Sequence, residues 1–370
     1  MTKMDECLRS QKLSSLLTGM CKKSWKQRGF TKKTTIISLI VILVSNSRTG
    51  PEVRKVLFYT KTKNGGYVIM KLSLCCISNI LGEQGLKFRT MTYKTFSSMP
   101  RADALAKLSK IVHNNFQVTH KIIRFCDEQG IKGYRLSSDL TPVLNHPDVL
   151  LKMEDLPEFG FIQHEITNIK RYLATSDIKI SAHPSEYITL TTDDPKAIAN
   201  SILDLETHAD IFNRIGLPED YSAPLNIHCR KDGDPEIISG KFMNTYAKLS
   251  DSVRKRLVIE VNDNKSGVWS VKNLVKHFYD KHNIPITFDT LHHKFLHSDL
   301  SDKDAFELAY STWDTTPVFH YSEGIGETRN HASMALGIPE SYGYDVVWDV
   351  ELKNKDYAIL DIMNRAKVTV

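Results

Sequence analysis

The pattern of apolar and polar positions changes at about residue 71. From there onward, short apolar runs rich in β-branched residues alternate with longer segments in which apolar residues recur at helical spacing. Strands that alternate with helices in this way are typical of repeated βα units, whose strands lie parallel in one sheet. The pattern predicts eight strands, at residues 71–77, 133–136, 178–183, 224–228, 257–261, 285–289, 317–320 and 345–351.

Segments of helical period lie between these strands. Eight strands with intervening helices in about 300 residues fit a (β/α)8 TIM barrel, so we expect an α/β protein whose barrel domain covers residues 70–370. A turn signal, Asn64-Gly65-Gly66, stands just before the first strand and marks the boundary. The predicted helices include residues 103–115, 118–129, 195–215, 240–255, 271–282 and 301–310.

The first 69 residues are predicted to form a basic N-terminal extension. Residues 1–70 hold 14 Lys and Arg against 3 Asp and Glu, a net charge of +11, whereas the whole chain is +6. The remaining residues therefore carry −5, so the barrel is mildly acidic and any phosphate-binding surface on it must be local. The apolar run 36–44 within the extension is expected to be a buried strand or part of a loosely attached extension, unless the start site is assigned too far upstream, in which case Met70 is the position to note.

The chain is not expected to enter a membrane or to be secreted. Its longest apolar run, residues 36–44, is far shorter than the roughly 20 residues that span a bilayer, and it begins late for a signal peptide. The six cysteines show neither the CxxC spacing of a zinc site nor the density of a disulfide-rich secreted fold. We expect an intracellular protein of the cytoplasm or nucleoid. The cysteines are Cys7, Cys21, Cys75, Cys76, Cys126 and Cys229.

Six consecutive predicted strands end in or next to a His, Asp or Glu. In a TIM barrel the carboxyl ends of the strands converge on one rim, where active sites are built, so these residues would meet in space. One His at a strand end is more often a hydrogen-bonded structural residue than a ligand, but the coincidence across six strands indicates a metal site. The residues are His183, His228, Glu260, Asp289 with the nearby His292, His320, and Glu351.

Imidazoles and carboxylates without thiolates suit Mn²⁺, Zn²⁺ or Fe²⁺. The set also holds more ligands than one ion needs, which favours a cluster of two or three ions. Such clusters commonly hydrolyse phosphate esters, because they generate hydroxide and neutralise the charge that develops on the phosphoryl oxygens.

Four segments together resemble the UV damage endonucleases. They occur in the same order and at family-like spacing, and the resemblance covers residues 71–356. The segments are Tyr134-Arg135-Leu136-Ser137-Ser138-Asp139-Leu140-Thr141-Pro142, His183-Pro184-Ser185-Glu186-Tyr187, Asn226-Ile227-His228 and Phe288-Asp289-Thr290-Leu291-His292-His293.

The resemblance implies a TIM barrel related to endonuclease IV and the xylose isomerase group, with a cluster of manganese-type ions or, alternatively, zinc. It implies an enzyme that acts as a monomer on damaged double-stranded DNA. Such enzymes nick the strand immediately 5′ of a cyclobutane dimer, a 6-4 photoproduct or an abasic site, and leave a 3′-hydroxyl and a 5′-phosphate.

The resemblance also assigns roles to residues. Glu260, His228 and Glu351 would be catalytic, and Glu186 with Tyr187 would take the place of the pair that probes the damaged site. Positively charged loop residues, among them Arg230, Lys231 and Lys265, are candidates for phosphate contacts or are ordinary surface charges. The implied metal ligands are His183, His228, Glu260, Asp289, His292, His320, His331 and Glu351.

Several positions depart from the family pattern. Glu186 stands where the family has Gln, and a carboxylate is repelled by DNA phosphate. Val318 stands where the family commonly has a modified Lys that bridges metals, and a valine cannot bind a metal. Ser185 replaces a Gly, Ser73-Leu74 replaces a Gly-Tyr element, and the run Glu260-Val261-Asn262-Asp263 is one residue longer than usual.

Two alternatives to the endonuclease stay open. A xylose-isomerase-like sugar isomerase or epimerase would use the same kind of rim, because a fold does not by itself determine a function. A damage-binding protein with weak catalysis is the second alternative, and Val318 and Glu186 are the residues that favour it.

Overall fold

The computed structural model describes residues 59–61, 67–264, 267–297 and 299–368. Most of the predicted extension, including the apolar run 36–44, lies outside the described residues. The two short strands β1 (Tyr59–Lys61) and β2 (Tyr67–Ile69) pair antiparallel just before the barrel. Over the part of the chain that the structure describes, no helix combines the length and apolar character needed to cross a membrane.

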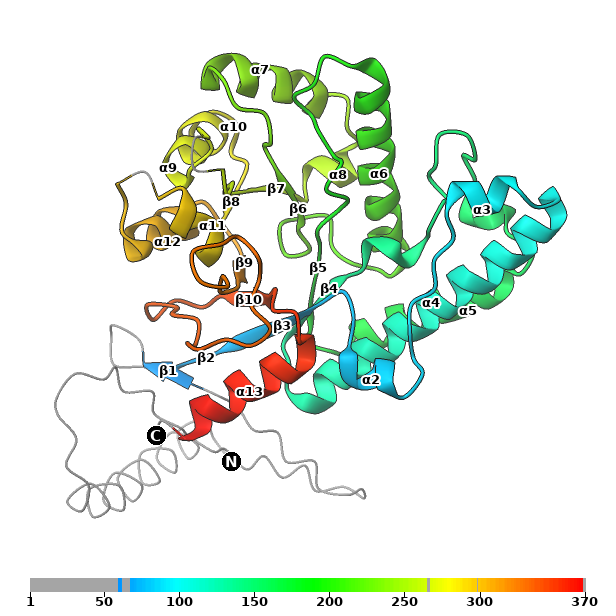
Figure 1. Ribbon diagram of the computed structural model, residues 1–370, viewed down its shortest axis with the longest axis horizontal. Helices are drawn as coiled ribbons and strands as arrows, with labels where there is room; N and C mark the ends of the chain where they lie inside the picture. The colour runs from blue at the N-terminus through cyan, green and yellow to red at the C-terminus, as the bar shows by residue number, and fades with distance from the viewer. Residues whose placement is uncertain (1–58, 62–66, 265–266, 298, 369–370) are drawn as a thin grey trace, which may run out of the picture. The chain divides into compact units, whose positions relative to one another are not determined.

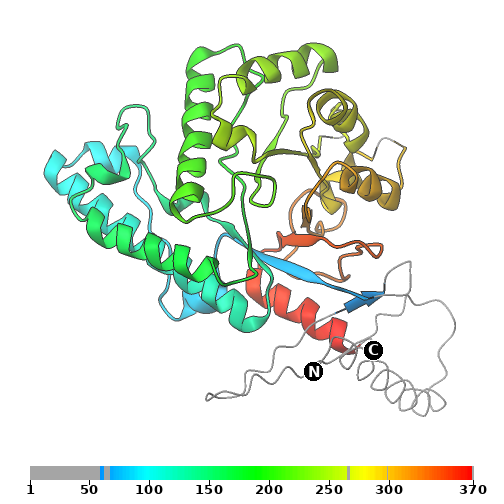
Figure 2. The same cartoon turned by 180° about the vertical axis from the view of Figure 1, so that it is seen from behind.

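Eight parallel strands form the barrel, and all eight predicted strands are confirmed. Their hydrogen-bonded order is β8-β7-β6-β5-β4-β3-β10-β9, and the ring closes between β8 and β9, where the His320 N–H donates to the Phe288 carbonyl at 2.9 Å. Helices surround the strands (Figures 1 and 2), so the predicted TIM barrel is confirmed. The strands are β3 (Lys71–Cys75), β4 (Gly133–Leu136), β5 (Lys179–Ala182), β6 (Leu225–His228), β7 (Leu257–Glu260), β8 (Ile286–Thr287), β9 (Val318–Tyr321) and β10 (Val347–Val350).

The predictions of helices at 195–215, 271–282 and 301–310 are confirmed, and the second of these contains a π-helical segment, Val275–Tyr279. Five helices were not among the examples that the sequence pattern gave: α2, α3, α5, α11 and α13. The helices are α2 (Asn79–Glu83), α3 (Tyr93–Ser97), α4 (Arg101–Gln129), α5 (Phe159–Leu173), α6 (Pro195–Arg214), α7 (Pro235–Tyr246), α8 (Asp251–Arg254), α9 (Val271–Leu274), α10 (Asp280–His282), α11 (Thr290–Phe295), α12 (Asp302–Tyr310) and α13 (Lys355–Val368).

The prediction of two helices at 103–115 and 118–129 is wrong, because α4 runs unbroken through both segments. Asn115, the last residue of the first predicted segment, lies within the helix, and its buried side chain bonds to residues outside the helix. Its amide donates to the Arg89 carbonyl at 2.9 Å and to the Asp139 carbonyl at 3.0 Å. Asn115 therefore connects the helix to two loops.

The predicted helix at 240–255 is also wrong in its bounds. The Asp234 side chain accepts hydrogen bonds from the first turn of α7 and Pro235 follows it, so α7 begins before Gly240. A second cap, Ser250, starts the separate helix α8. Both caps are strong local start signals, and they outweigh the apolar spacing that suggested one helix.

The alternation of side chains along the strands places a polar layer inside the barrel. The Ser181 hydroxyl on β5 donates to Asp349 on β10 at 3.0 Å, and two strands separate β5 from β10, so this contact passes through the interior. Gly133 makes room in this layer, because a Cβ at this position would lie 2.6 Å from the Cβ of Ser73. The outward positions, such as Tyr134 and Trp348, are buried with the apolar core. The polar layer lies directly beneath the predicted metal ligands.

Candidate metal centre

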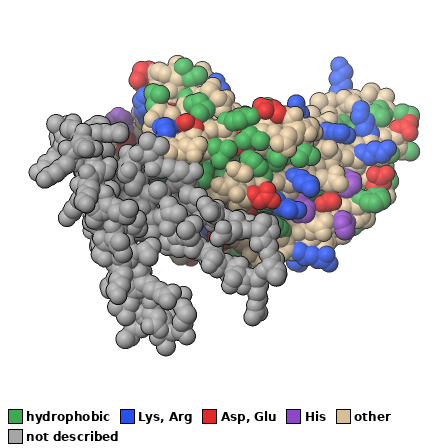
Figure 3. All heavy atoms as spheres, turned by 90° about the horizontal axis from the view of Figure 1, so that it is seen from below, with side chains coloured by type: hydrophobic (Ala, Val, Ile, Leu, Met, Phe, Trp, Pro, Cys, Tyr) green, Lys and Arg blue, Asp and Glu red, His purple; other side chains and the backbone are tan. Residues whose placement is uncertain are grey.

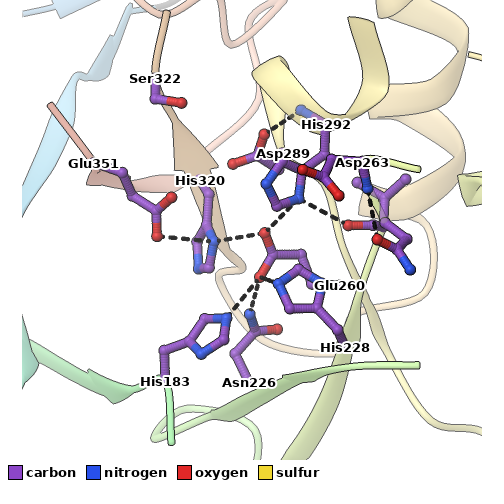
Figure 4. Close-up of polar contacts among 12 residues, drawn as sticks. His183, Asn226, His228, Glu260, Asp263, Asp289, His292, His320, Ser322 and Glu351 are labelled. Atoms are coloured by element: carbon purple, nitrogen blue, oxygen red, sulfur yellow. Dashed lines mark hydrogen bonds and ion pairs between the residues drawn. The ribbon is translucent and has the colours of Figure 1, made fainter. Parts of the chain in front are cut away.

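The carboxylate of Glu260, at the end of β7, is the centre of the strand-end cluster (Figure 4). The side chain is only 1% exposed. Its Oε2 atom lies 3.2 Å from His183 Nε2 and 3.6 Å from His228 Nε2, and it accepts a hydrogen bond from the Asn226 amide. One carboxylate oxygen thus joins the ends of β5, β6 and β7.

The other oxygen of Glu260 faces two further histidines. Its Oε1 atom lies 3.2 Å from His292 Nδ1 and 3.1 Å from His320 Nδ1. Asp289 caps the first turn of α11, where its Oδ1 accepts from the His292 N–H at 2.6 Å. The cap explains why Asp289 and His292 lie in the same group: the helix begins directly after Asp289, and its first turn brings the His292 ring toward the rim.

Glu351, directly after β10, forms the other side of the cluster. Its Oε1 atom lies 3.5 Å from His320 Nδ1 and accepts from the Arg135 guanidinium, and its Oε2 atom lies 3.9 Å from His331 Nε2. The His331 ring also contacts the Glu351 carbonyl, with Nδ1 at 2.6 Å. His331 comes from the long connection between β9 and β10, which therefore reaches back to the rim.

All eight predicted ligands lie in this region, and seven of them fall into three overlapping groups. Within each group one donor atom per residue lies within 4.8 Å of the others. Glu260 and Asp289 each belong to two groups, so the groups form one continuous centre, and His331 lies outside them beside Glu351. The groups are His183, His228 and Glu260; Glu260, Asp289 and His292; and Asp289, His320 and Glu351.

Among the ligand-type residues, His228 Nδ1 and Asp289 Oδ2 are buried without a hydrogen-bond partner. Leaving a polar atom buried and unpaired costs roughly 1–3 kcal/mol, and such atoms are uncommon in folded proteins. Together with donor atoms that lie within 4.8 Å of one another in each group, they indicate a site for a divalent cation.

The protonation of the centre follows from burial and from the shared charge. Burial lowers the pKa of His228 to about 3. Burial opposes the charge on His320 as well, but Glu260 outweighs it and raises the pKa of His320 to about 9. Burial also opposes the charge on Glu260, yet His320 and His228 hold its pKa well below the usual range. At neutral pH in the metal-free protein the Glu260 carboxylate is therefore charged and His320 carries a proton, which a bound cation would replace.

A cavity of about 800 Å³ opens above these residues. Besides the ligand-type side chains, it is lined by four cations, Arg135, Arg230, Arg329 and Lys355. Arg135 pairs with Glu351 and Arg329 pairs with Asp263, while Glu186 is a further carboxylate of the wall. Cations and carboxylates are therefore interspersed in the cavity, as they are on the face drawn in Figure 3.

The residues predicted to contact DNA lie in different places. Glu186 and Arg230 line the cavity. Tyr187 is 92% exposed and lines a neighbouring cavity of about 530 Å³. Lys231 is exposed and does not line the cavity; its Nζ lies 3.7 Å from Asp193 Oδ2. Lys265 lies outside the described residues.

Three residues to which the sequence pattern assigned no role lie in or below the centre: Arg135, Asn226 and Asp349. A usable signal exists, because side chains two residues apart on a strand share a face. Asp349 precedes Glu351 by two residues and Asn226 precedes His228 by two, so both face the interior with the ligands. Val318 stands in the same relation to His320, is 3% exposed and offers no ligand atom.

The fold and the centre define the class of protein: a TIM barrel with a potential metal site of imidazoles and carboxylates at the carboxyl ends of its strands. Within that class, residues 66–369 match the family model described as UV-endonuclease UvdE. The chain therefore belongs to the UV-endonuclease UvdE family.

Similar proteins agree with this assignment. A UV DNA damage endonuclease of Nostoc sp. is 28% identical over 303 residues, which cover 78% of this chain and 88% of the relative. One of Bacillus velezensis is 26% identical over 295 residues, 74% of this chain and 87% of the relative. The crystal structure of SacUVDE superposes with a TM-score of 0.69 at 26% identity, and the match covers 81% of this chain and 98% of that one.

Proposed function

We propose that the protein is a metal-dependent endonuclease that nicks DNA on the 5′ side of cyclobutane dimers, 6-4 photoproducts or abasic sites. The observation that carries the proposal is the cluster of ligand-type side chains in a cavity that cationic side chains also line, in a chain of the UV-endonuclease family. Damaged double-stranded DNA is the proposed partner, and the enzyme is proposed to act inside the cell as a monomer.

The proposed cofactor is a cluster of two or three Mn²⁺ ions, with Zn²⁺ as the alternative. The residues present fit such ions, because the buried Asp289 Oδ2 has no hydrogen-bond partner, the donor atoms of each group lie within 4.8 Å of one another, and no thiolate is among the ligands. When bound, divalent ions supply a hydrolytic nucleophile and neutralise charge on the phosphoryl oxygens. The proposed ligands are His183, His228, Glu260, Asp289, His292, His320, His331 and Glu351, and Glu260, His228 and Glu351 are proposed to be essential for catalysis.

The chain's own residues are proposed to bind and orient the DNA. Arg230, Arg329 and Lys355 line the cavity wall and would pair with phosphates next to the cut site. Tyr187, exposed beside the cavity, would stack on a base in the distorted duplex. Glu186 lines the same cavity and reduces its positive potential, and Lys231 would contact phosphate only when it leaves Asp193.

The endonuclease is favoured over the sugar isomerase or epimerase by two observations. The chain belongs to the UV-endonuclease family, and the cavity wall offers Arg230 and Lys355 for contacts with phosphate beside Arg329, which pairs with Asp263 at 3.2 Å. A damage-binding protein with weak catalysis is separated from the enzyme only by an assay of nicking.

The test is a nicking assay on irradiated and unirradiated supercoiled plasmid, with Mn²⁺ or with a chelator. We expect nicks only in irradiated plasmid and only with Mn²⁺. His183→Ala should abolish nicking, whereas His164→Ala, which changes an exposed histidine on α5 that does not line the cavity, should not. Binding to irradiated plasmid without nicking would identify a damage-binding protein, and no interaction with either plasmid would reject both DNA functions.

A further inference from the structure

Asp349 lies on β10 and faces the interior of the barrel, two residues before the proposed ligand Glu351. It is 0% exposed. Its Oδ2 atom accepts a hydrogen bond from the Ser181 hydroxyl at 3.0 Å, and its Oδ1 atom has no hydrogen-bond partner. A fully buried carboxylate with an unpaired oxygen lowers the stability of the folded protein. Its presence therefore suggests that Asp349 has a function.

The nearest functional neighbour of Asp349 is His320. The two residues are register partners on the adjacent strands β9 and β10, and His320 Nε2 lies 3.8 Å from Asp349 Oδ2. The other ring nitrogen, Nδ1, faces the opposite way, toward Glu260 at 3.1 Å and Glu351 at 3.5 Å. The imidazole thus stands between a carboxylate below it and the proposed metal centre above it.

We propose that Asp349 is a positioning residue for His320. A neutral imidazole carries one N–H, and a hydrogen bond from Nε2–H to Asp349 leaves the lone pair of Nδ1 directed at the metal centre. Shortening the 3.8 Å separation by about 0.9 Å gives an ordinary hydrogen bond. Ser181 holds the carboxylate in place from the far side of the barrel. The inference rests on the proposed metal site.

Asp356 provides a matched comparison. Its carboxylate is also 0% exposed, but both oxygens accept hydrogen bonds at the start of α2: Oδ1 from the Asn79 N–H at 3.1 Å, and Oδ2 from the Ile80 N–H at 3.1 Å and from the Ser78 hydroxyl. Both oxygens of Asp356 are hydrogen-bonded to the start of α2, so its replacement should lower the stability of the protein without changing metal binding.

The experiment measures Mn²⁺ affinity of the purified full chain by isothermal titration calorimetry. Asn at position 349 presents an amide N–H to the ring and favours the opposite tautomer, so Asp349→Asn should weaken Mn²⁺ binding about 10- to 100-fold, as loss of such supporting groups does. Asp356→Asn should lower the melting temperature and leave Mn²⁺ affinity unchanged. If Asp349→Asn does not fold, Ser181→Ala should weaken Mn²⁺ binding in the same direction by a smaller factor.

A double-mutant cycle shows whether Asp349 acts through His320. In the His320→Ala background, Asp349→Asn should cause no further loss of Mn²⁺ affinity, because the ring that it orients is gone. An equal loss in both backgrounds, or unchanged affinity in Asp349→Asn, would overturn the inference while the metal site stands. Absence of Mn²⁺ binding by the unaltered protein would instead overturn the proposed metal-dependent function on which the inference rests.

Discussion

Two buried arginines, Arg256 and Arg135, differ in how their guanidinium groups are paired. Arg256, just before β7, is 0% exposed and donates to the Pro218 carbonyl at 2.9 Å, the Leu217 carbonyl at 3.0 Å and the Ser252 hydroxyl at 2.6 Å. Arg135, on β4 at the cavity, pairs with Glu351 through one nitrogen, and its Nε atom has no partner.

This difference in pairing distinguishes the two ends of the barrel. The amino ends of the strands hold a side chain with a structural role, and the carboxyl ends hold the proposed functional site. At the amino ends of the strands, the Arg256 guanidinium is fully engaged by the chain that surrounds it. At the carboxyl ends, atoms of Arg135, His228 and Asp289 are buried and unpaired, at a cost of roughly 1–3 kcal/mol for each. Such a loss of stability is common where the groups serve binding or catalysis. Substitutions at the two ends of the barrel should therefore have different effects.

The largest effect is expected from Glu260→Gln. The change removes the charge that four histidines share and a carboxylate that belongs to two of the three candidate metal groups. Nicking of irradiated plasmid at saturating Mn²⁺ should therefore fall by more than the roughly 100-fold that loss of a supporting group costs. The initial rate of nicking is the measurement.

Glu236→Gln is the matched control for this change. Glu236 is exposed on α7 and pairs with Lys281, so its replacement should leave the nicking rate unaltered. A Glu260→Gln protein that nicks at the normal rate would show that the strand-end cluster is not the active centre.

The second prediction compares the stability and the nicking rate of two variants in which a buried arginine is replaced by methionine. Arg256→Met leaves the carbonyls of Pro218 and Leu217 without their donor, and hydrogen bonds to charged groups contribute about 1.5–3 kcal/mol each. The free energy of unfolding in urea should drop by about 3 kcal/mol, with Mn²⁺ affinity unchanged. Arg135→Met should instead slow nicking. At saturating Mn²⁺ it should lower the free energy of unfolding less than Arg256→Met does, because bound cations then neutralise the charge of Glu351.

Equal losses of stability in the two arginine variants, with nicking retained in both, would refute the distinction between the two ends. The measurements are urea unfolding followed by circular dichroism and the nicking rate, both made on the same protein preparations.

The sequence was sufficient to predict the barrel and the clustering of the candidate ligands, but not the polar layer below them. The strands were predictable because buried parallel strands are short apolar runs, and the clustering because strand ends converge. The pairing of Ser181 with Asp349 joins strands that are not neighbours, and only the closed barrel brings them together. The continuity of α4 was missed because the contacts of Asn115 with Arg89 and Asp139 are tertiary, not local.

The smallest expected effect is a pH dependence of stability in the metal-free protein. Burial lowers the pKa of His228 from 6.5 to about 3, so below pH 6.5 the unfolded chain binds a proton that the folded protein does not, and stability falls as the pH drops. For His320, burial is outweighed by Glu260 and the pKa rises from 6.5 to about 9. Its contribution is complete below pH 6.5 and is lost as the pH rises toward 9.

The two histidines thus predict a maximum of stability near pH 6.5 for protein held in chelator. Melting temperatures measured between about pH 5 and 9, the range in which histidines titrate, would reveal it. His228→Gln should flatten the acid side of the curve, because the group that titrates there is removed. Saturating Mn²⁺ should flatten the alkaline side, because a cation then replaces the proton on His320. A maximum that stays in place with Mn²⁺ would mean that His320 does not bind the metal, and the functional end of the barrel would lose one of its proposed ligands.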